Sequence, residues 1–139
     1  MDEIKAVERA NQEFYDALQQ LSLNRMDQIW LHEDWVKCIH PGWELIEGWS
    51  DIRSSWENIF RNTQSMQIAL TQVSVRREGE LAIVVCTENI SSHSPEGIRS
   101  ALALATNLYV QRNGRWLMVH HHASPLPMDD SVLWSDTVQ

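Results

Sequence analysis

NLYVQRNGRWLMVHHH, residues 107–122, places two alternating runs of apolar and polar residues on either side of Asn113-Gly114. This dipeptide predicts a two-residue type I′ hairpin turn, because that turn needs positive φ at both central residues. The turn then sets the pairing, with Asn107 opposite His120. One face of the hairpin is expected to carry Asn107, Tyr109, Trp116, Met118, His120 and His122. The other face is expected to carry Leu108, Val110, Leu117 and Val119.

The rest of the C-terminal half predicts a meander of strands. Residues 81–90 and 99–111 alternate in polarity, and each is bounded by a turn signal, Glu78-Gly79 and residues 93–97. Taking Glu78-Gly79 as a loop places Val75 opposite Ala82, with Cys86 and Glu88 on the same face. Three alanines, Ala101, Ala103 and Ala105, share the face of Asn107 and leave room there. A mismatch in parity between residues 68–70 and 73–75 predicts a β-bulge near Thr71-Gln72.

The N-terminal half predicts three helices and two short strands. Apolar residues at three- and four-residue spacing favour helices over about residues 2–21, with Asp2 as a cap, and 25–32. Residues 35–40 and 43–47 are typical of strands, and Ser50 is expected to cap a third helix that buries Ile52 and Trp56. Helices followed by an antiparallel meander predict an α+β fold, with three N-terminal helices packed in the concave face of a strongly bent, mainly antiparallel sheet. The resulting cone has an open end.

Size and composition restrict the class of protein. A chain of 139 residues fits a single domain over residues 1–139, with a core over about 4–126 and a tail over 127–139. A net charge of -8 disfavours nucleic acid and anionic membrane surfaces as partners. The longest apolar run, residues 81–86, is too short to cross a bilayer. Cys38 and Cys86 are expected to be buried thiols in a cytoplasmic protein, since neither lies in a metal-binding spacing.

The outer face of the predicted sheet is unusually apolar. Leucine, isoleucine and valine side chains of three strands gather there, which is more than a solvated monomer usually exposes. Covering ~600 Å² of this face at about 25 cal/mol per Å² would contribute about 15 kcal/mol before the cost of association. We therefore expect a homodimer through the outer sheet face. The alternative is that the chain's own tail, residues 128–139 with Leu133 and Trp134, covers part of it.

Two segments carry a family resemblance. Residues 114–124, GRWLMVHHHAS, are similar to the closing strand of SnoaL-like proteins in the nuclear transport factor 2-like (ketosteroid isomerase-like) superfamily. His40-Pro41 and residues 47–53, EGWSDIR, resemble the end of the first strand and the start of the third helix in that family. The resemblance covers about residues 4–126. It implies a cone-shaped α+β fold, often dimeric through its sheet.

The resemblance also bears on the site. Isomerases of this superfamily use a carboxylate directly before the proline as base, and His40 stands there in this chain. Their oxyanion tyrosine corresponds to Phe14, with Tyr15 one residue away, and their protonated aspartate falls near Asn107. The pocket arginines of the kinase association domains align with Glu88 and Asn107. These exchanges disfavour steroid isomerisation and an anionic ligand.

The strand phases suggest a pocket for a small, largely apolar molecule. Predicted catalytic residues are His40, Glu88 and His120. An apolar cavity raises the pKa of a carboxyl group such as Glu88, which suits it to act as a general acid or base. For Glu88, an ion pair with Arg99 or a histidine is the alternative, and for His120 a structural hydrogen bond. Predicted ligand-binding residues are Tyr15, Trp43, Trp56, Asn107, Tyr109, Trp116 and His122, although the aromatic ones also suit plain core packing.

Metal and cofactor chemistry are not expected. His120 and His122 would share a face, but two ligands are too few for a zinc site unless His40 supplies a third. Two functions follow from these residues. One is a dimeric pocket protein with isomerase-, cyclase- or dehydratase-type chemistry and no cofactor. The other is a non-enzymatic module for oligomerisation or protein association.

Overall fold

The computed structural model describes residues 3–128 as three helices and six strands that follow one another along the chain. Their bounds are α1 Glu3–Gln19, α2 Leu23–Ile29, β1 Lys37–Ile39, β2 Ile46–Glu47, α3 Trp49–Arg61, β3 Ser65–Glu78, β4 Leu81–Ser94, β5 Gly97–Arg112 and β6 Arg115–Leu126. The α+β class and the cone-shaped arrangement are confirmed. Asp2 and the tail beyond residue 128 lie outside the described residues.

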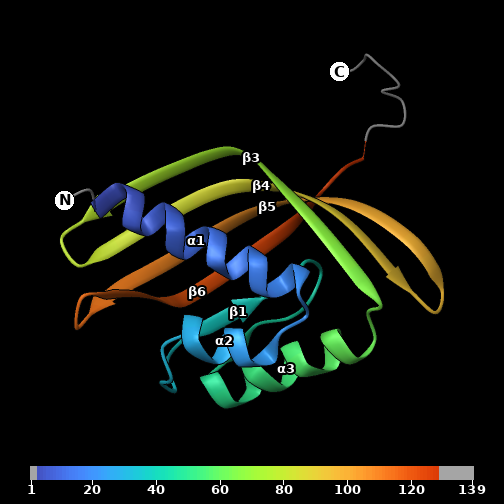
Figure 1. The fold of residues 1–139 in the computed structure, drawn as a ribbon, viewed down its shortest axis with the longest axis horizontal. Coiled ribbons are helices and arrows are strands. Elements are labelled where there is room, and N and C mark those ends of the chain that lie inside the picture. The colour runs from blue at the N-terminus through green and yellow to red at the C-terminus, as the bar shows by residue number, and fades with distance from the viewer. Residues whose placement is uncertain (1–2, 129–139) are drawn as a thin grey trace.

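All strands join one sheet in the order β2-β1-β6-β5-β4-β3. Every neighbouring pair is antiparallel except β1 and β6, which run parallel. The three helices lie on one face, with α1 running along the long strands and α2 and α3 beside the short strand β1 (Figure 1). The parallel contact matters for function, because it brings the end of β1 beside the histidines of β6.

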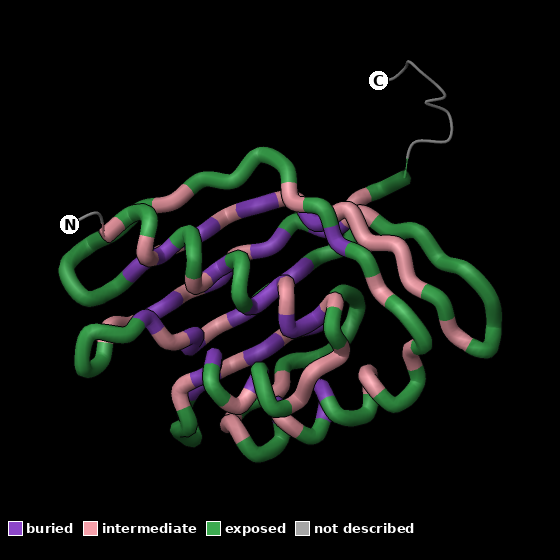
Figure 2. The backbone as a smooth tube through the Cα atoms, in the orientation of Figure 1, coloured by how far each residue is buried: buried purple, intermediate pink, exposed green. Residues whose placement is uncertain are grey.

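The core lies between the helices and the middle of the sheet. Buried segments of neighbouring strands lie side by side, and burial decreases toward the hairpin ends (Figure 2). Ala103 and Ala105 are buried, as their alternate positions predicted. Ala101 is exposed instead, because the β4–β5 hairpin extends past the helices (Figure 1). No helix in the described residues is long and apolar enough to span a membrane.

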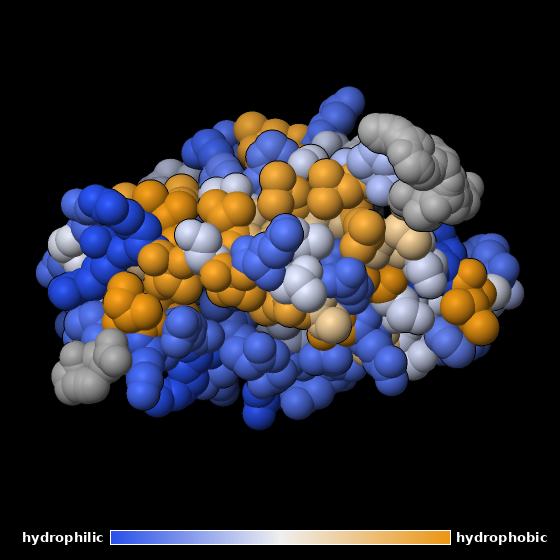
Figure 3. Space-filling view, turned by 90° about the horizontal axis from the view of Figure 1, so that it is seen from above, coloured by the Kyte–Doolittle hydropathy of each residue, from blue (hydrophilic) through white to orange (hydrophobic). Residues whose placement is uncertain are grey.

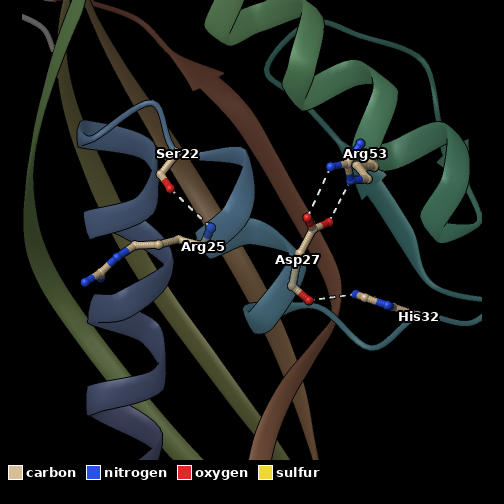
Figure 4. Close-up of polar contacts among 5 residues, drawn as sticks. All are labelled: Ser22, Arg25, Asp27, His32 and Arg53. Atoms are coloured by element: carbon tan, nitrogen blue, oxygen red, sulfur yellow. Dashed lines mark hydrogen bonds and ion pairs between the residues drawn. The ribbon is translucent and has the colours of Figure 1, made fainter.

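Polar contacts fix α2 between its neighbours. The Ser22 hydroxyl accepts a hydrogen bond from the backbone N–H of Arg25 at 3.2 Å and so caps the helix. Arg53 of α3 donates to both carboxylate oxygens of Asp27, at 2.7 and 3.2 Å (Figure 4). The His32 ring contacts the backbone oxygen of Asp27 at 2.7 Å. These contacts hold α3, which carries one wall of the site, against α2.

The predicted hairpin turn and the first bulge are confirmed. Asn113 and Gly114 have φ values of 52° and 78°, as a type I′ turn requires. The register of β3 against β4 shifts between Thr71 and Ser74, and Gln72 has φ 53°. A bulge of this kind bends a strand, and β3 forms the edge of the sheet, above α1 in the view of Figure 1.

A second bulge, in β6, was not predicted and corrects the register near the site. Leu108 pairs with His120 and Tyr109 pairs with Met118, which leaves Val119 as the extra residue. Asn107 therefore faces His121 rather than His120. The predictions that His120 and His122 point inward and that Val119 points outward are wrong. Val119 and His121 are buried, whereas His122 is exposed.

Two smaller predictions also need correction. The β3–β4 loop consists of Gly79 and Glu80, because Glu78 still pairs with Leu81; Val75 consequently faces Val84 rather than Ala82. This shift of two keeps the predicted face. The third helix begins at Trp49 with Gly48 as its N-cap, at φ 93° and without a side-chain bond, so Ser50 lies in the first turn and does not cap it.

The outer sheet face remains apolar in the folded chain. Leu104 is 42% exposed, and its neighbours on this face are half-buried: Ile83, Val85, Leu102, Leu108, Val110 and Leu117. Seen from above, apolar side chains form a band between polar margins (Figure 3). The predicted patch is thus present on the described chain.

Candidate functional site

A cavity of about 210 Å³ opens between the helices and the inner face of the sheet. Its walls are mostly apolar, and three ionisable side chains reach it. The lining residues are Leu18, His40, Pro41, Trp43, Trp56, Ile59, Met66, Ile68, Glu88, Ile90 and His121. Four predicted site residues are therefore brought together: His40 and Trp43 from the segment that follows β1, Glu88 from β4 and Trp56 from α3.

Glu88 projects from the middle of β4 into the floor of this cavity. It is buried, and its Oε2 accepts a 2.6 Å hydrogen bond from the Tyr15 hydroxyl. Burial raises the pKa of the Glu88 carboxyl to about 7, and the Tyr15 bond opposes part of that rise. Among the ion pairs of residues 3–128, none involves Glu88, so the alternative partners Arg99 and histidine are not found. The carboxyl can thus gain or lose a proton near neutral pH.

Tyr15 gives a direct test of this balance. Replacing Tyr15 by phenylalanine removes the hydrogen bond that favours the ionised carboxylate, and desolvation then acts unopposed. The pKa of Glu88 is expected to rise further above its usual range. Carboxyl ¹³C chemical shifts followed through a pH titration measure it. A Glu88 pKa that is unchanged or lower in the variant would contradict this account.

His40 forms the opposite wall. Its Nε2 lies 2.9 Å from the hydroxyl of Ser55, and that hydroxyl donates its own proton to the backbone oxygen of Ile52 at 2.6 Å. The rings of Trp43 and Trp56 meet His40 edge to face at 4.6 and 4.5 Å. Burial lowers the pKa of His40 to about 4, so its imidazole is neutral at pH 7.

His121 takes the place predicted for His120. Its Nδ1 lies 2.6 Å from Oδ1 of Asn107, and its ring packs 4.8 Å from that of Phe14. Burial lowers the pKa of His121 well below its usual value, and the neighbouring His40 adds to the effect. Strand alternation predicted that a histidine of this run faces Asn107. The bulge at Val119 moves that position from His120 to His121.

A buried polar chain supports the site from behind. The Tyr109 hydroxyl donates to Oδ1 of Asn11 at 2.7 Å, and Nδ2 of Asn107 donates to the same oxygen at 2.9 Å and to the Tyr15 hydroxyl at 3.1 Å. Tyr15, Asn107 and Tyr109 were predicted to contact a ligand. None of them lines the cavity; they position Glu88 and His121.

Asn11 was missed by sequence reasoning, although its signal was present. It stands in the buried stripe of α1 with Val7, Phe14 and Leu18, where a polar side chain needs a partner.

The remaining predicted residues lie elsewhere. Trp116 donates from Nε1 to Glu3 at 3.1 Å and lines a separate hollow of about 190 Å³ near the Asn113-Gly114 turn. His120 and His122 lie on the other face of β6, with ring centroids 6.4 Å apart. Within residues 3–128, no three histidine, cysteine, aspartate or glutamate side chains are grouped to hold a metal ion. Cys38 and Cys86 are buried free thiols, as predicted.

Sequence comparison decides the family. Residues 7–129 match the SnoaL-like domain. This chain is a member of the SnoaL-like family. The suspected membership is therefore confirmed, and the SnoaL-like fold of the nuclear transport factor 2-like superfamily accounts for the helices and the bent sheet.

Solved structures and a curated relative resemble this SnoaL-like chain. A putative dehydratase from the NTF2-like family of Streptomyces avermitilis is 32% identical, with a TM-score of 0.85 over 91% of this chain and 97% of that one. A putative calcium/calmodulin-dependent protein kinase type II association domain from Thiobacillus denitrificans is 31% identical, with a TM-score of 0.76 over 86% and 94%.

The F-box protein SKIP8 of Arabidopsis thaliana is 32% identical over 126 residues, or 91% of this chain. The chain spans about half the length of that curated relative, 52%.

Proposed function

We propose that this SnoaL-like protein binds a small, largely apolar molecule in the cavity and transforms it by acid/base chemistry with its own side chains. The observation that carries this proposal is the Glu88 carboxyl, which is buried without a cationic partner among residues 3–128 and opens into an apolar cavity between two neutral imidazoles. A group whose pKa lies near the working pH is suited to both donate and accept protons.

A carboxyl group and neutral imidazoles in one cavity suit elimination of water from an alcohol. An unprotonated imidazole nitrogen takes a proton from carbon, and the electron pair of that C–H bond forms a C=C bond. The neighbouring C–O bond breaks, protonated Glu88 donates its proton to the leaving hydroxyl, and water departs. The likeness to a putative dehydratase supports this reaction class. Isomerisation would use the same two groups to move one proton between two carbons.

Paired variants test this proposal. Single-ring alcohols with an activated hydrogen beside the carbinol carbon serve as substrates, and ultraviolet absorbance of the new double bond reports turnover. Glu88→Gln and His40→Asn are each expected to reduce kcat by about 10²- to 10⁴-fold. Glu44→Gln, an exposed carboxylate outside the cavity, is the control. Unchanged turnover in both cavity variants would contradict acid/base catalysis by these two residues.

The outer sheet face supports a second function, self-association. Its apolar band needs a cover, and the likeness to a putative kinase association domain at 31% identity supports a second copy in that place. We propose a homodimer through this face. In a non-enzymatic module this assembly would itself be the function. The two buried free thiols support a reducing location such as the cytoplasm.

A further inference from the structure

We infer that the cavity selects a neutral ligand by its hydrogen-bond donors, that is, a compact ring compound carrying hydroxyl or N–H groups. The inference rests on the proposed function, because it concerns the same cavity and names its ligand class. The hydrogen bonds behind each polar lining residue determine which of its atoms is left as an acceptor.

The first acceptor is Nδ1 of His40. A serine hydroxyl has one proton, and Ser55 donates it to the backbone oxygen of Ile52. Ser55 Oγ can therefore only accept at the 2.9 Å contact, so His40 carries its proton on Nε2. Nδ1 is left with a lone pair, and its protein contact is the weak donor Cys38 Sγ at 3.9 Å.

The second acceptor is Nε2 of His121. Tyr109 donates to Oδ1 of Asn11, and that shared oxygen orients Nδ2 of Asn107 toward α1. Oδ1 of Asn107 consequently faces His121 and accepts from its Nδ1–H at 2.6 Å. Nε2 has a lone pair, the only His121 side-chain hydrogen bond found within residues 3–128 is that of Nδ1, and the ring lines the cavity.

The third acceptor belongs to Glu88. Tyr15 donates to Oε2, and this is the only hydrogen bond of the Glu88 side chain found among residues 3–128, so Oε1 keeps its lone pairs. The ionised carboxylate only accepts, and the protonated form adds a single donor. The other side-chain donors in the lining are two indoles. Trp43 lies at the exposed mouth, and the Nε1 of Trp56 is buried without a partner.

Three acceptors in an apolar enclosure discriminate between ligands. An unpaired lone pair facing a ligand's carbonyl or carboxylate oxygen loses its water without gaining a bond, and such mismatches reduce affinity strongly. The volume of about 210 Å³ exceeds the roughly 150 Å³ that holds a benzene molecule, so one substituted ring fits. The selected ligand is thus a small phenol, cyclic alcohol or N–H heterocycle.

Phenol and anisole form the test pair, because methylation removes the donor and keeps the ring. Titrations followed by NMR are expected to show phenol about tenfold tighter than anisole and benzaldehyde, with shifts at His40 and His121. Long-range ¹H–¹⁵N spectra should show His40 protonated at Nε2 and His121 at Nδ1. Ser55→Ala removes the acceptor that keeps the His40 proton on Nε2. This variant is expected to reduce the ratio of phenol affinity to anisole affinity at least twofold. Ser54→Ala, its exposed neighbour on α3, should leave the preference unchanged.

Equal affinities for phenol and anisole, or no binding of either, would overturn the inference, as would the opposite histidine tautomers. The acid/base proposal fails separately. If Glu88→Gln and His40→Asn leave turnover unchanged while the phenol preference persists, donor selection stands and catalysis does not.

Discussion

Glu88→Gln is expected to stabilise the folded protein by about 3 kcal/mol at pH 8 and by less than about 1 kcal/mol at pH 5. Burial raises the pKa of Glu88 from 4.5 to about 7. Well below pH 4.5 the carboxyl is neutral in the folded and unfolded states and does not affect the free energy of unfolding. As the pH rises from 4.5 to 7, the unfolded chain ionises first, so stability falls until the folded carboxyl has also ionised. Glutamine keeps the Tyr15 contact and removes this loss.

Urea unfolding of both proteins at pH 5, 6, 7 and 8 measures the difference. His40 and His121 also make stability depend on pH. Their contribution cancels in the difference, because the parent and the Glu88→Gln protein both contain them. Glu44→Gln is the matched control and should show no trend with pH. A Glu88→Gln protein that is less stable than the parent at pH 8 would contradict the raised pKa. A variant that is more stable than the parent at pH 8 but has lost turnover would fit a carboxyl that is retained for chemistry at a cost in stability.

Leu104→Glu is expected to weaken self-association by at least about 100-fold. Leu104 is 42% exposed on the outer sheet face, among half-buried apolar neighbours. In a symmetric dimer each substitution occurs twice, so two carboxylates enter an apolar contact, and like charges there cost several kcal/mol. Folding should be preserved, because the side chain already reaches solvent in the single chain.

Sedimentation over a range of protein concentrations measures this effect. Leu45→Glu places the same charge on a 55%-exposed leucine in the segment between β1 and β2, and it should leave the assembly unchanged. An unaffected dimer in the Leu104 variant, or a parent protein that is monomeric throughout, would remove the proposed interface. It would leave the cavity proposal intact, since the cavity lies between the helices and the opposite face of the sheet.

The fold was predictable because its signals are local. Asn113-Gly114 demands positive φ, the alternation of Ala103 and Ala105 marks one face, and the parity change at Thr71-Gln72 marks a bulge. Each signal involves neighbours within a few residues, where backbone sterics and strand geometry leave few choices. His40 and Glu88 could be placed in the cavity for the same reason.

The second bulge could not be predicted. Val119 has no positive φ, and neither glycine nor proline stands beside it. The bulge lies where β6 pairs with β5 on one side and, in parallel, with β1 on the other, so it belongs to a contact between segments about 80 residues apart in the chain. The tyrosine hydrogen bond to Glu88 was missed similarly, since it depends on how α1 rotates against the sheet.

Because Val119 interrupts β6, the strand consists of two independently phased parts. Trp116 and Met118 follow the hairpin turn, whereas His121 follows β1. Regular pairing without the bulge would instead place Val119 opposite Leu108 and His120 opposite Asn107, which would withdraw His121 and present a neighbouring imidazole to the ligand. A shift of one residue in register at Val119 therefore separates two alternative sites, which makes this position one at which the chemistry of the scaffold can be varied.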